Sequence, residues 1–170
     1  MLSRRALPLV AFAAFALVAL VACGGGQAKV ARSAQYKTDA TVVFKAVVDA
    51  AGQKYKVDRA DAPSGVVLTV ARWYEPEGNY EDMDATGNAA QLQDGSVLLR
   101  YEIRVVPGVV EGAFKVEVIP QVAVMRSGYA RPVDLKPDDL AVPGWVHGKT
   151  DALYETIYAS LKTYAVPAGA

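Results

Sequence analysis

Two neighbouring stretches of the chain alternate between apolar and polar residues, and this alternation limits the fold more than any other feature. Every second residue is apolar from 97 to 105, and again from 114 to 118. Successive side chains of a strand point to opposite faces, so each stretch is expected to form a strand with one buried face. Pro107, Gly108 and Gly112 lie between the stretches and supply turn residues. The pattern therefore predicts an antiparallel hairpin.

The charged residues of the hairpin indicate how its strands are aligned. Pairing Glu102 with Lys115 would also place Arg100 opposite Glu117, which gives two pairs of opposite charge across the strands. Residues 122–125 are expected to extend the second strand.

A helix is expected ahead of the strands, over residues 38–51, because apolar residues recur there at the helical spacing. The side-chain oxygen of Thr38 or Asp39 can cap its first turn, and Gly52 is expected to end it. Its β-branched valines make it a poor helix by itself, so it should depend on packing against a sheet. The side chains expected to make that contact are Phe44, Val47 and Val48.

The remaining elements are predicted from similar patterns. Short strands are expected at 33–37 and 54–59, and residues 66–74 are apolar on both faces, as in a central strand covered on each side. A turn is expected at 62–65, and residues 127–144, which contain three prolines, are expected to form an ordered connection with little regular structure.

A second helix is expected to start at Trp145, or at the latest Asp151, and to run to about Tyr164, with the chain fraying after it. Helices that flank a set of antiparallel strands predict an α+β fold, in which an antiparallel sheet packs against two helices in two layers. Residues 33–166 are expected to form this single domain.

The N-terminus has the three parts of a secretory signal: Arg4 and Arg5, an uncharged run over residues 6–22, and small residues before Cys23. The sequence Leu20-Val21-Ala22-Cys23 resembles the lipobox of bacterial lipoproteins. The resemblance implies cleavage between Ala22 and Cys23, so that residues 1–22 are a signal peptide and Cys23 is lipidated. Cys23 is the only cysteine, and acylation would explain a thiol that has no disulfide partner.

An uncleaved transmembrane helix and a plain secretory signal are the alternatives. The 17 uncharged residues would barely cross about 30 Å of hydrocarbon at about 1.5 Å per residue. Pro8 and the glycines at 24–26 also disfavour a span.

The lipoprotein hypothesis predicts where the protein works. Residues 23–32 are expected to form a flexible tether between the lipid and the domain. Gly24 stands where lipoproteins retained at the inner membrane carry Asp, which favours the outer membrane, facing the periplasm. Loss of Arg4 and Arg5 leaves 16 basic against 18 acidic residues, and no basic patch favours nucleic acid as a partner.

The helix at 40–51, followed by Tyr55-Lys56-Val57-Asp58 and a Gly-led strand, is similar to the helix-grip domains of the BamC type. These belong to accessory lipoproteins of outer-membrane β-barrel assembly. The likeness covers residues 33–74 and continues as strand order. It implies a helix-grip-like fold and a non-catalytic, protein-binding role at the outer membrane. The acidic insertion and the Pro-rich stretch depart from that family.

Residues 75–95 are rich in glycine and acidic residues. The run from Asp82 to Gly87 fits the first half of an EF-hand loop, which makes Asp82 and Asp84 candidate cation ligands. The twelfth position is Gln93, which cannot supply the bidentate carboxylate. We therefore expect a mobile, solvated loop; a weak cation site and a partner-binding loop are the alternatives.

No catalytic residue is predicted. His147 is the only histidine, and neither a nucleophile elbow nor a phosphate-binding glycine loop is present, so His147 is expected to be structural. Asp138 and Asp139 are expected to start a short helical turn. Trp73 and Tyr74 are the candidate residues of an exposed recognition surface.

We therefore expect a lipid-anchored envelope protein that acts by binding another envelope protein, without cofactor or catalysis. The alternative is a carrier of a small ligand or lipid. An enclosed apolar cavity would favour the carrier, and a filled core with an exposed apolar groove would favour the protein-binding module.

Overall fold

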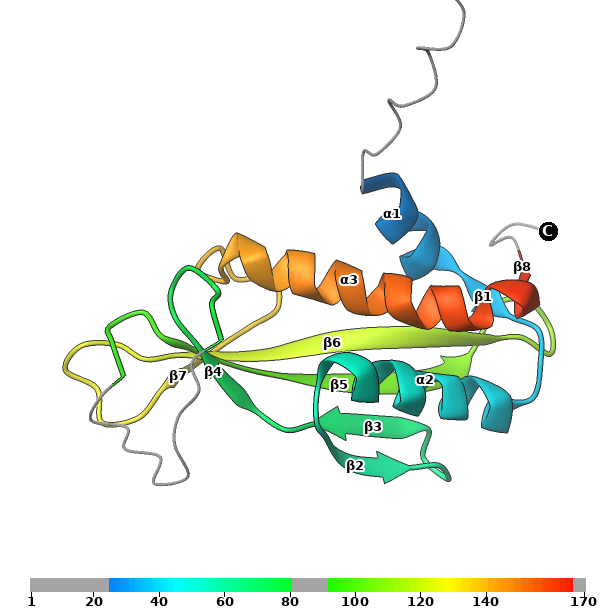
Figure 1. Ribbon diagram of the computed structural model, residues 1–170, viewed down its shortest axis with the longest axis horizontal. Helices are drawn as coiled ribbons and strands as arrows, with labels where there is room; N and C mark the ends of the chain where they lie inside the picture. The colour runs from blue at the N-terminus through cyan, green and yellow to red at the C-terminus, as the bar shows by residue number, and fades with distance from the viewer. Residues whose placement is uncertain (1–24, 81–91, 167–170) are drawn as a thin grey trace, which may run out of the picture.

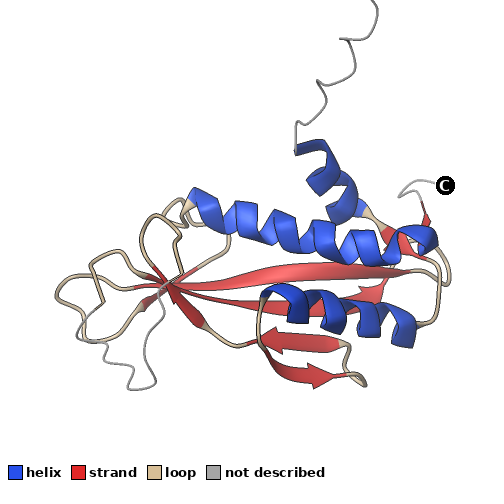
Figure 2. Ribbon diagram, in the orientation of Figure 1, coloured by secondary structure: helices blue, strands red, loops and turns tan. Residues whose placement is uncertain are grey.

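The computed structural model describes residues 25–80 and 92–166, and within them eight strands form one antiparallel sheet whose core-facing side is covered by helices (Figures 1 and 2). The strand order is β2-β3-β5-β6-β1-β8, with β4 also paired to β5 and β7 also paired to β6. The predicted α+β class, with an antiparallel sheet packed against helices, is confirmed. The elements are α1 (Gly25–Ser33), β1 (Gln35–Tyr36), α2 (Ala40–Lys54), β2 (Val57–Asp61), β3 (Val66–Thr69), β4 (Arg72–Tyr74), β5 (Val97–Pro107), β6 (Phe114–Val124), β7 (Val133–Leu135), α3 (Gly144–Leu161), a 3-10 turn (Lys162–Tyr164) and β8 (Ala165–Val166).

The long hairpin of β5 and β6 forms the centre of the sheet, as predicted, but the predicted register is wrong. Glu102 lies opposite Ile119, four residues further along β6 than expected, and Arg104 is the residue opposite Glu117. The reason is the loop, which takes six residues (108–113) and is held by the Gln35 side chain, whose oxygen accepts from the backbone N–H of Val110 at 3.0 Å. Because the shift is an even number of residues, the predicted faces are unchanged.

The stretch 66–74, predicted as one strand covered on both faces, is two strands, β3 and β4, that both pair with β5. At the break between them, the backbone N–H of Tyr101 donates to the Thr69 hydroxyl at 2.9 Å. Val67 and Thr69 are buried, whereas Val66 and Leu68 are half-buried. The sheet is therefore covered on one face only at this point.

The turn between β2 and β3 depends on a glycine. Gly65 has φ +68°, and a Cβ there would lie 2.7 Å from the carbonyl oxygen of Val105. The same contact brings the backbone together, since the Val105 N–H donates to the Gly65 carbonyl at 2.8 Å. The predicted turn at 62–65 is thus also the point where the β2–β3 hairpin joins β5.

Helix α2 packs on the sheet as predicted, but its buried stripe and its ends differ from the prediction. The buried residues are Val43, Val47, Ala50 and Ala51. Phe44 and Val48 are only half-buried and flank this stripe. The helix continues through Gly52 to Lys54, and the side chain of Asp39 makes no capping hydrogen bond.

Phe44 is half-buried because it faces the sheet margin. It lines a small hollow of about 210 Å³ between the start of α2 and the β2–β3 turn. The centre of the contact with the sheet is therefore one residue earlier, at Val43, which has no exposed surface.

Helix α3 lies beside α2 on the same face, as Figure 1 shows, and both contribute to one core cluster. Its buried residues include Leu153, Ile157 and Leu161, which were all predicted. The predicted fraying is wrong for Val166, which lies in β8 and pairs with Gln35 in β1; residues 167–170 lie outside the described residues. A short edge strand of two residues gives no periodic signal, so the sequence pattern could not indicate it.

The predicted tether is wrong for residues 25–32, which belong to helix α1. Its Ala28 and Ala31 are 6 % and 3 % exposed, and α1 contacts α3 and β6. The Arg32 side chain bridges to Asp151 of α3 at 2.6 Å and lies over the Tyr154 ring at 5.7 Å from its centroid. The glycine-rich start indicated flexibility, but alanines let α1 approach α3 closely enough to pack.

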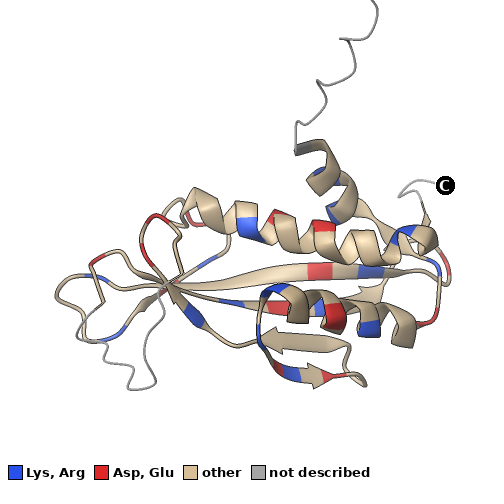
Figure 3. Cartoon of the chain, in the orientation of Figure 1, with Lys and Arg blue, Asp and Glu red and all other residues tan. Residues whose placement is uncertain are grey.

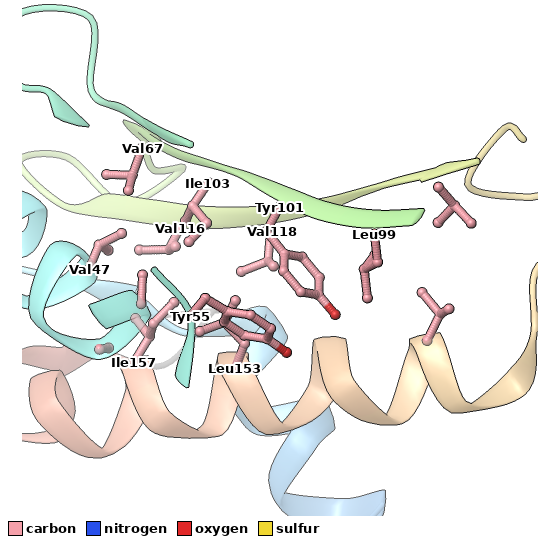
Figure 4. Close-up of a cluster of buried hydrophobic side chains, with 14 of the residues drawn as sticks. Val47, Tyr55, Val67, Leu99, Tyr101, Ile103, Val116, Val118, Leu153 and Ile157 are labelled. Carbon is pink, nitrogen blue, oxygen red and sulfur yellow. The ribbon is translucent and has the colours of Figure 1, made fainter. Parts of the chain in front are cut away.

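Side chains fill the space between the sheet and the helices. Figure 4 shows Tyr101 and Ile103 of β5 directed from the sheet towards Leu153 and Ile157 of α3. All four have no exposed surface. Burial of apolar area at about 25 cal/mol per Å² is the main source of the stability of such a core.

Strand β6 protects its own open edge between its partners β1 and β7. There the backbone N–H of Val118 points away from β5 and donates to the Tyr154 hydroxyl at 2.8 Å. Pro120 lies two residues further along β6, so its backbone nitrogen also faces away from β5. Proline has no N–H, so no donor at this position needs a partner. This stretch of edge therefore offers little to a strand from another chain.

The connection 127–144 contains one short strand, β7, and is otherwise irregular, as expected. Asp139 forms a turn, with its carboxylate accepting from the Ala141 N–H at 2.8 Å and its carbonyl accepting from the Val142 N–H at 3.0 Å.

Candidate functional site: the open face of the sheet

We call the side of β4, β5 and β6 that points away from α2 and α3 the open face. Along each strand, residues of the open face alternate with residues of the core. On β5, Val97 and Leu99 are 0 % and 2 % exposed in the core, whereas Leu98 between them is half-buried on the other side. No helix in the described residues covers this side (Figure 2). The open face comprises Trp73, Leu98, Arg100, Glu102, Arg104, Glu117, Ile119, Gln121 and Ala123.

A groove of about 570 Å³ runs over the open face and is open to solvent. Its apolar lining includes Leu98 and Ile119, and Leu98 lies directly opposite Ala123 in the β5–β6 ladder. Ala71, from the link between β3 and β4, and Pro137, after β7, line it from two sides. The result is a largely apolar groove whose lining also includes Arg100, Gln121 and Asp134.

Polar side chains, among them Arg100 and Gln121, also line the groove and are connected by hydrogen bonds. Arg100 donates to Gln121, whose amide donates to Glu102 at 2.7 Å, and Arg104 donates to the same carboxylate at 2.6 Å. The chain of hydrogen bonds joins β5 to β6 and fixes the side chains in place. Acidic and basic residues are interspersed over the rest of the fold (Figure 3), so charge of one sign does not define the surface.

The two residues proposed as a recognition surface are separated by the structure. Trp73 lies opposite Leu98 in the β4–β5 ladder and is half-buried on the open face, next to the groove. Tyr74 points to the core side and is 3 % exposed, which contradicts its predicted role. Adjacent residues of a strand point to opposite faces, so only one of the pair could be exposed.

Tyr74 instead belongs to an aromatic cluster that holds the start of the predicted loop. Its ring lies 5.3 Å from that of Trp145, and the Lys149 ammonium is 4.8 Å from the Tyr74 centroid. The Trp145 indole N–H donates to the Pro76 carbonyl at 2.8 Å, and a Cβ at Gly78 would lie 2.7 Å from the Trp145 ring. Residues 75–80 are therefore packed against α3, which contradicts the predicted mobile loop for this part of 75–95; residues 81–91 lie outside the described residues.

A second group of polar side chains is buried under α3, where Tyr55 and Tyr101 meet with ring centroids 5.0 Å apart (Figure 4). The Thr150 hydroxyl lies 3.5 Å from that of Tyr101. Burial raises the pKa of Tyr101 far above its ordinary value, and burial also raises the pKa of Tyr55. Both phenols stay protonated at neutral pH, so they stabilise the core as hydrogen-bonding groups and are poor bases or nucleophiles.

The remaining predicted site residues take no part in a described site. His147 is exposed in the first turns of α3. Asp82, Asp84, Ala22 and Cys23 lie outside the described residues. Within the described ranges, no three His, Cys, Asp or Glu side chains come together in a group that could hold a metal ion.

The groove was not predicted, although the sequence contains a signal for it. Leu98 and Ile119 are apolar residues at positions where the alternation calls for polar ones. Their place on one side of a hairpin indicates a second contact surface, but which residue lies opposite each of them depends on the register, which the sequence pattern did not predict.

The chain matches no protein-family model, and no curated protein matches it. The resemblance to the helix-grip lipoproteins therefore stays a prediction. None of the helices in residues 25–80 and 92–166 is long and apolar enough to cross a membrane.

Proposed function

We propose that this protein is a lipid-anchored component of the bacterial cell envelope that binds another envelope protein through the open face of its sheet. The observation that carries the proposal is an apolar groove on the uncovered side of a sheet whose other side is a filled core. The sequence Leu20-Val21-Ala22-Cys23 supports attachment through Cys23, at the outer membrane and facing the periplasm.

The groove has the character of a protein contact. It combines apolar side chains with the hydrogen-bonding groups of Arg100 and Gln121, and protein–protein interfaces likewise combine apolar contact area with direct hydrogen bonds. Leu98 and Ile119 supply apolar contact area. Trp73, opposite Leu98, is a residue type enriched among those that dominate binding energy.

The alternative, a carrier of a small ligand or lipid, has less support. A carrier encloses most of its ligand in a cavity. Here Tyr101, Leu153 and Ile157, with no exposed surface, occupy the space between the sheet and α3 where such a ligand would lie. The groove on the other side is open rather than enclosing.

Affinity purification of the full-length protein from its own envelope tests the proposal. Unchanged protein should bring down a specific partner, and Ile119→Asp, which puts a charge in the groove, should lose it. Ala159→Asp, a control on the exposed side of α3, should retain it. The unfolding midpoint of each variant separates loss of binding from loss of fold. Equal recovery by all three proteins would contradict the proposal.

A further inference from the structure

The N-terminal helix α1 determines which part of the domain approaches the membrane. If Cys23 carries lipid, as proposed above, only Gly24 separates it from the first residue of α1. Two residue steps span at most about 7 Å. The start of α1 must therefore lie near the lipid headgroups.

Helix α1 is also fixed to the rest of the domain. Ala28 and Ala31 are buried, and Arg32 is held both by Asp151 at 2.6 Å and by the face of Tyr154. A flexible tether would let the domain rotate freely relative to the membrane. A helix that is packed against the domain restricts this rotation, because the anchored end of the helix and the domain move together. The surface beside α1 is thus expected to stay near the bilayer.

That surface includes a hollow of about 680 Å³ between α1 and the sheet, open to solvent. Three basic side chains line it: Lys29 and Arg32 from α1, and Lys115 from β6. Lys115 lies 3.3 Å from Glu117, and both side chains are exposed. Glu117 therefore competes only weakly with another anion for Lys115. Among the described residues, no carboxylate lies within ion-pair distance of Lys29. Arg32 and Asp151, also in the lining, neutralise each other.

The same surface exposes apolar side chains. Val109, in the loop between β5 and β6, lines the hollow and is 93 % exposed, and Val30 on α1 is 51 % exposed. Glu111 in the same loop is exposed too. The attraction of this surface to an anionic bilayer therefore depends on the positions of the cations more than on the net charge. Cations with exposed apolar residues beside them suit the interface of an anionic bilayer.

We propose that α1 and the loop of residues 108–112 form a membrane-contact surface that takes anionic phospholipid headgroups. Lys29 and Lys115 lie against the headgroup phosphates, and Val30 and Val109 enter the headgroup layer. The anchored domain then has a fixed orientation, with the α1 end at the bilayer. This inference rests on the proposed lipidation of Cys23.

Fluorescence quenching on vesicles tests this surface. The full-length lipidated protein is labelled at Val109→Cys or, as a control, at Leu140→Cys, which is 103 % exposed in the loop between β7 and α3. It is then inserted into phosphatidylcholine vesicles, with or without phosphatidylglycerol, that contain a headgroup-labelled quenching lipid. The dye at 109 should be quenched, more strongly with phosphatidylglycerol, and the dye at 140 should not.

Charge reversal sharpens the test. Lys29→Glu with Lys115→Glu should lower the quenching at 109 roughly twofold on anionic vesicles, whereas Lys136→Glu should leave it unchanged. Equal quenching at 109 and 140, or no response to phosphatidylglycerol, in protein that floats with the vesicles would overturn the inference and leave the anchor intact. Protein that does not float with the vesicles would contradict the proposed lipidation and the inference together.

Discussion

The two faces of the central hairpin have the same backbone and very different surroundings. On β5, Leu99 is 2 % exposed beneath the helices, whereas Leu98, the preceding residue, lines an open groove. The core side is filled by side chains from two helices. The open side keeps apolar residues at positions that the core does not need. The difference separates the residues that maintain the fold from those available for a partner.

The largest expected effect breaks this comparison directly. Leu99→Ala leaves a cavity in a filled core and should lower the free energy of unfolding by about 2–5 kcal/mol. Leu98→Ala, the same change one residue earlier, should cost less than about 1 kcal/mol because its surroundings are open. Denaturant unfolding measures both, and similar costs would mean that the open face is covered in the folded protein.

The second-largest effect is expected at alkaline pH, which should lower the free energy of unfolding through tyrosines on the core side. Burial raises the pKa of Tyr36 and of Tyr101 far above the ordinary value, chiefly because the phenolate would lose its hydration. Above about pH 10 the unfolded chain loses these protons while the folded chain keeps them, so stability falls with rising pH by up to about 1.4 kcal/mol per unit for each tyrosine.

The variant Tyr36→Phe checks that explanation. Above about pH 10, the free energy of unfolding of this variant should fall less steeply with pH, by up to about 1.4 kcal/mol per unit, because one of the two tyrosines is absent. Between pH 6 and about 8 the slope should be unchanged. A slope that stays the same above pH 10 would show that Tyr36 is not buried as described.

A smaller effect is expected at the edge of β6. Tyr154→Phe removes the hydroxyl that accepts from the Val118 N–H and should cost about 1–2 kcal/mol, because that donor is left without a partner. Tyr164→Phe, on a tyrosine that is 40 % exposed, is the matched control. Equal unfolding midpoints for the two variants would mean that water replaces the lost bond.

The smallest effect is expected from the open face. Arg104→Ala removes an ion pair between the exposed Arg104 and the half-buried Glu102, which should change the free energy of unfolding by less than about 1 kcal/mol. A loss above about 2 kcal/mol would make the polar chain of the open face a structural element.

Much of the fold follows from periodicity, and the errors have physical causes. The alternation in β5 and β6 predicts the hairpin and its buried face, since side-chain direction is set locally. The register depends on Gln35, distant in sequence, which holds the loop. Helix α1 was missed because small residues carry little hydrophobic signal, although they pack closely. Pro120 was an unused signal for an open edge in β6.

The candidate site was less predictable than the fold. Trp73 was identified from its place at a strand end, and Tyr74 was wrongly included because adjacent residues of a strand point to opposite faces and Tyr74 of β4 points to the core. The groove lies over the stretch of the β5–β6 ladder that contains Leu98 opposite Ala123 and Ile119 opposite Glu102, and this pairing is a consequence of the strand register.

The claim that the open face is the binding surface is tested most directly by site-specific photo-cross-linking in cells that make the full-length protein. A photoreactive residue at position 98 should give one adduct of defined size, and the same residue at position 159, exposed on α3, should give none. An adduct from position 159 alone, or from neither position, would contradict the account.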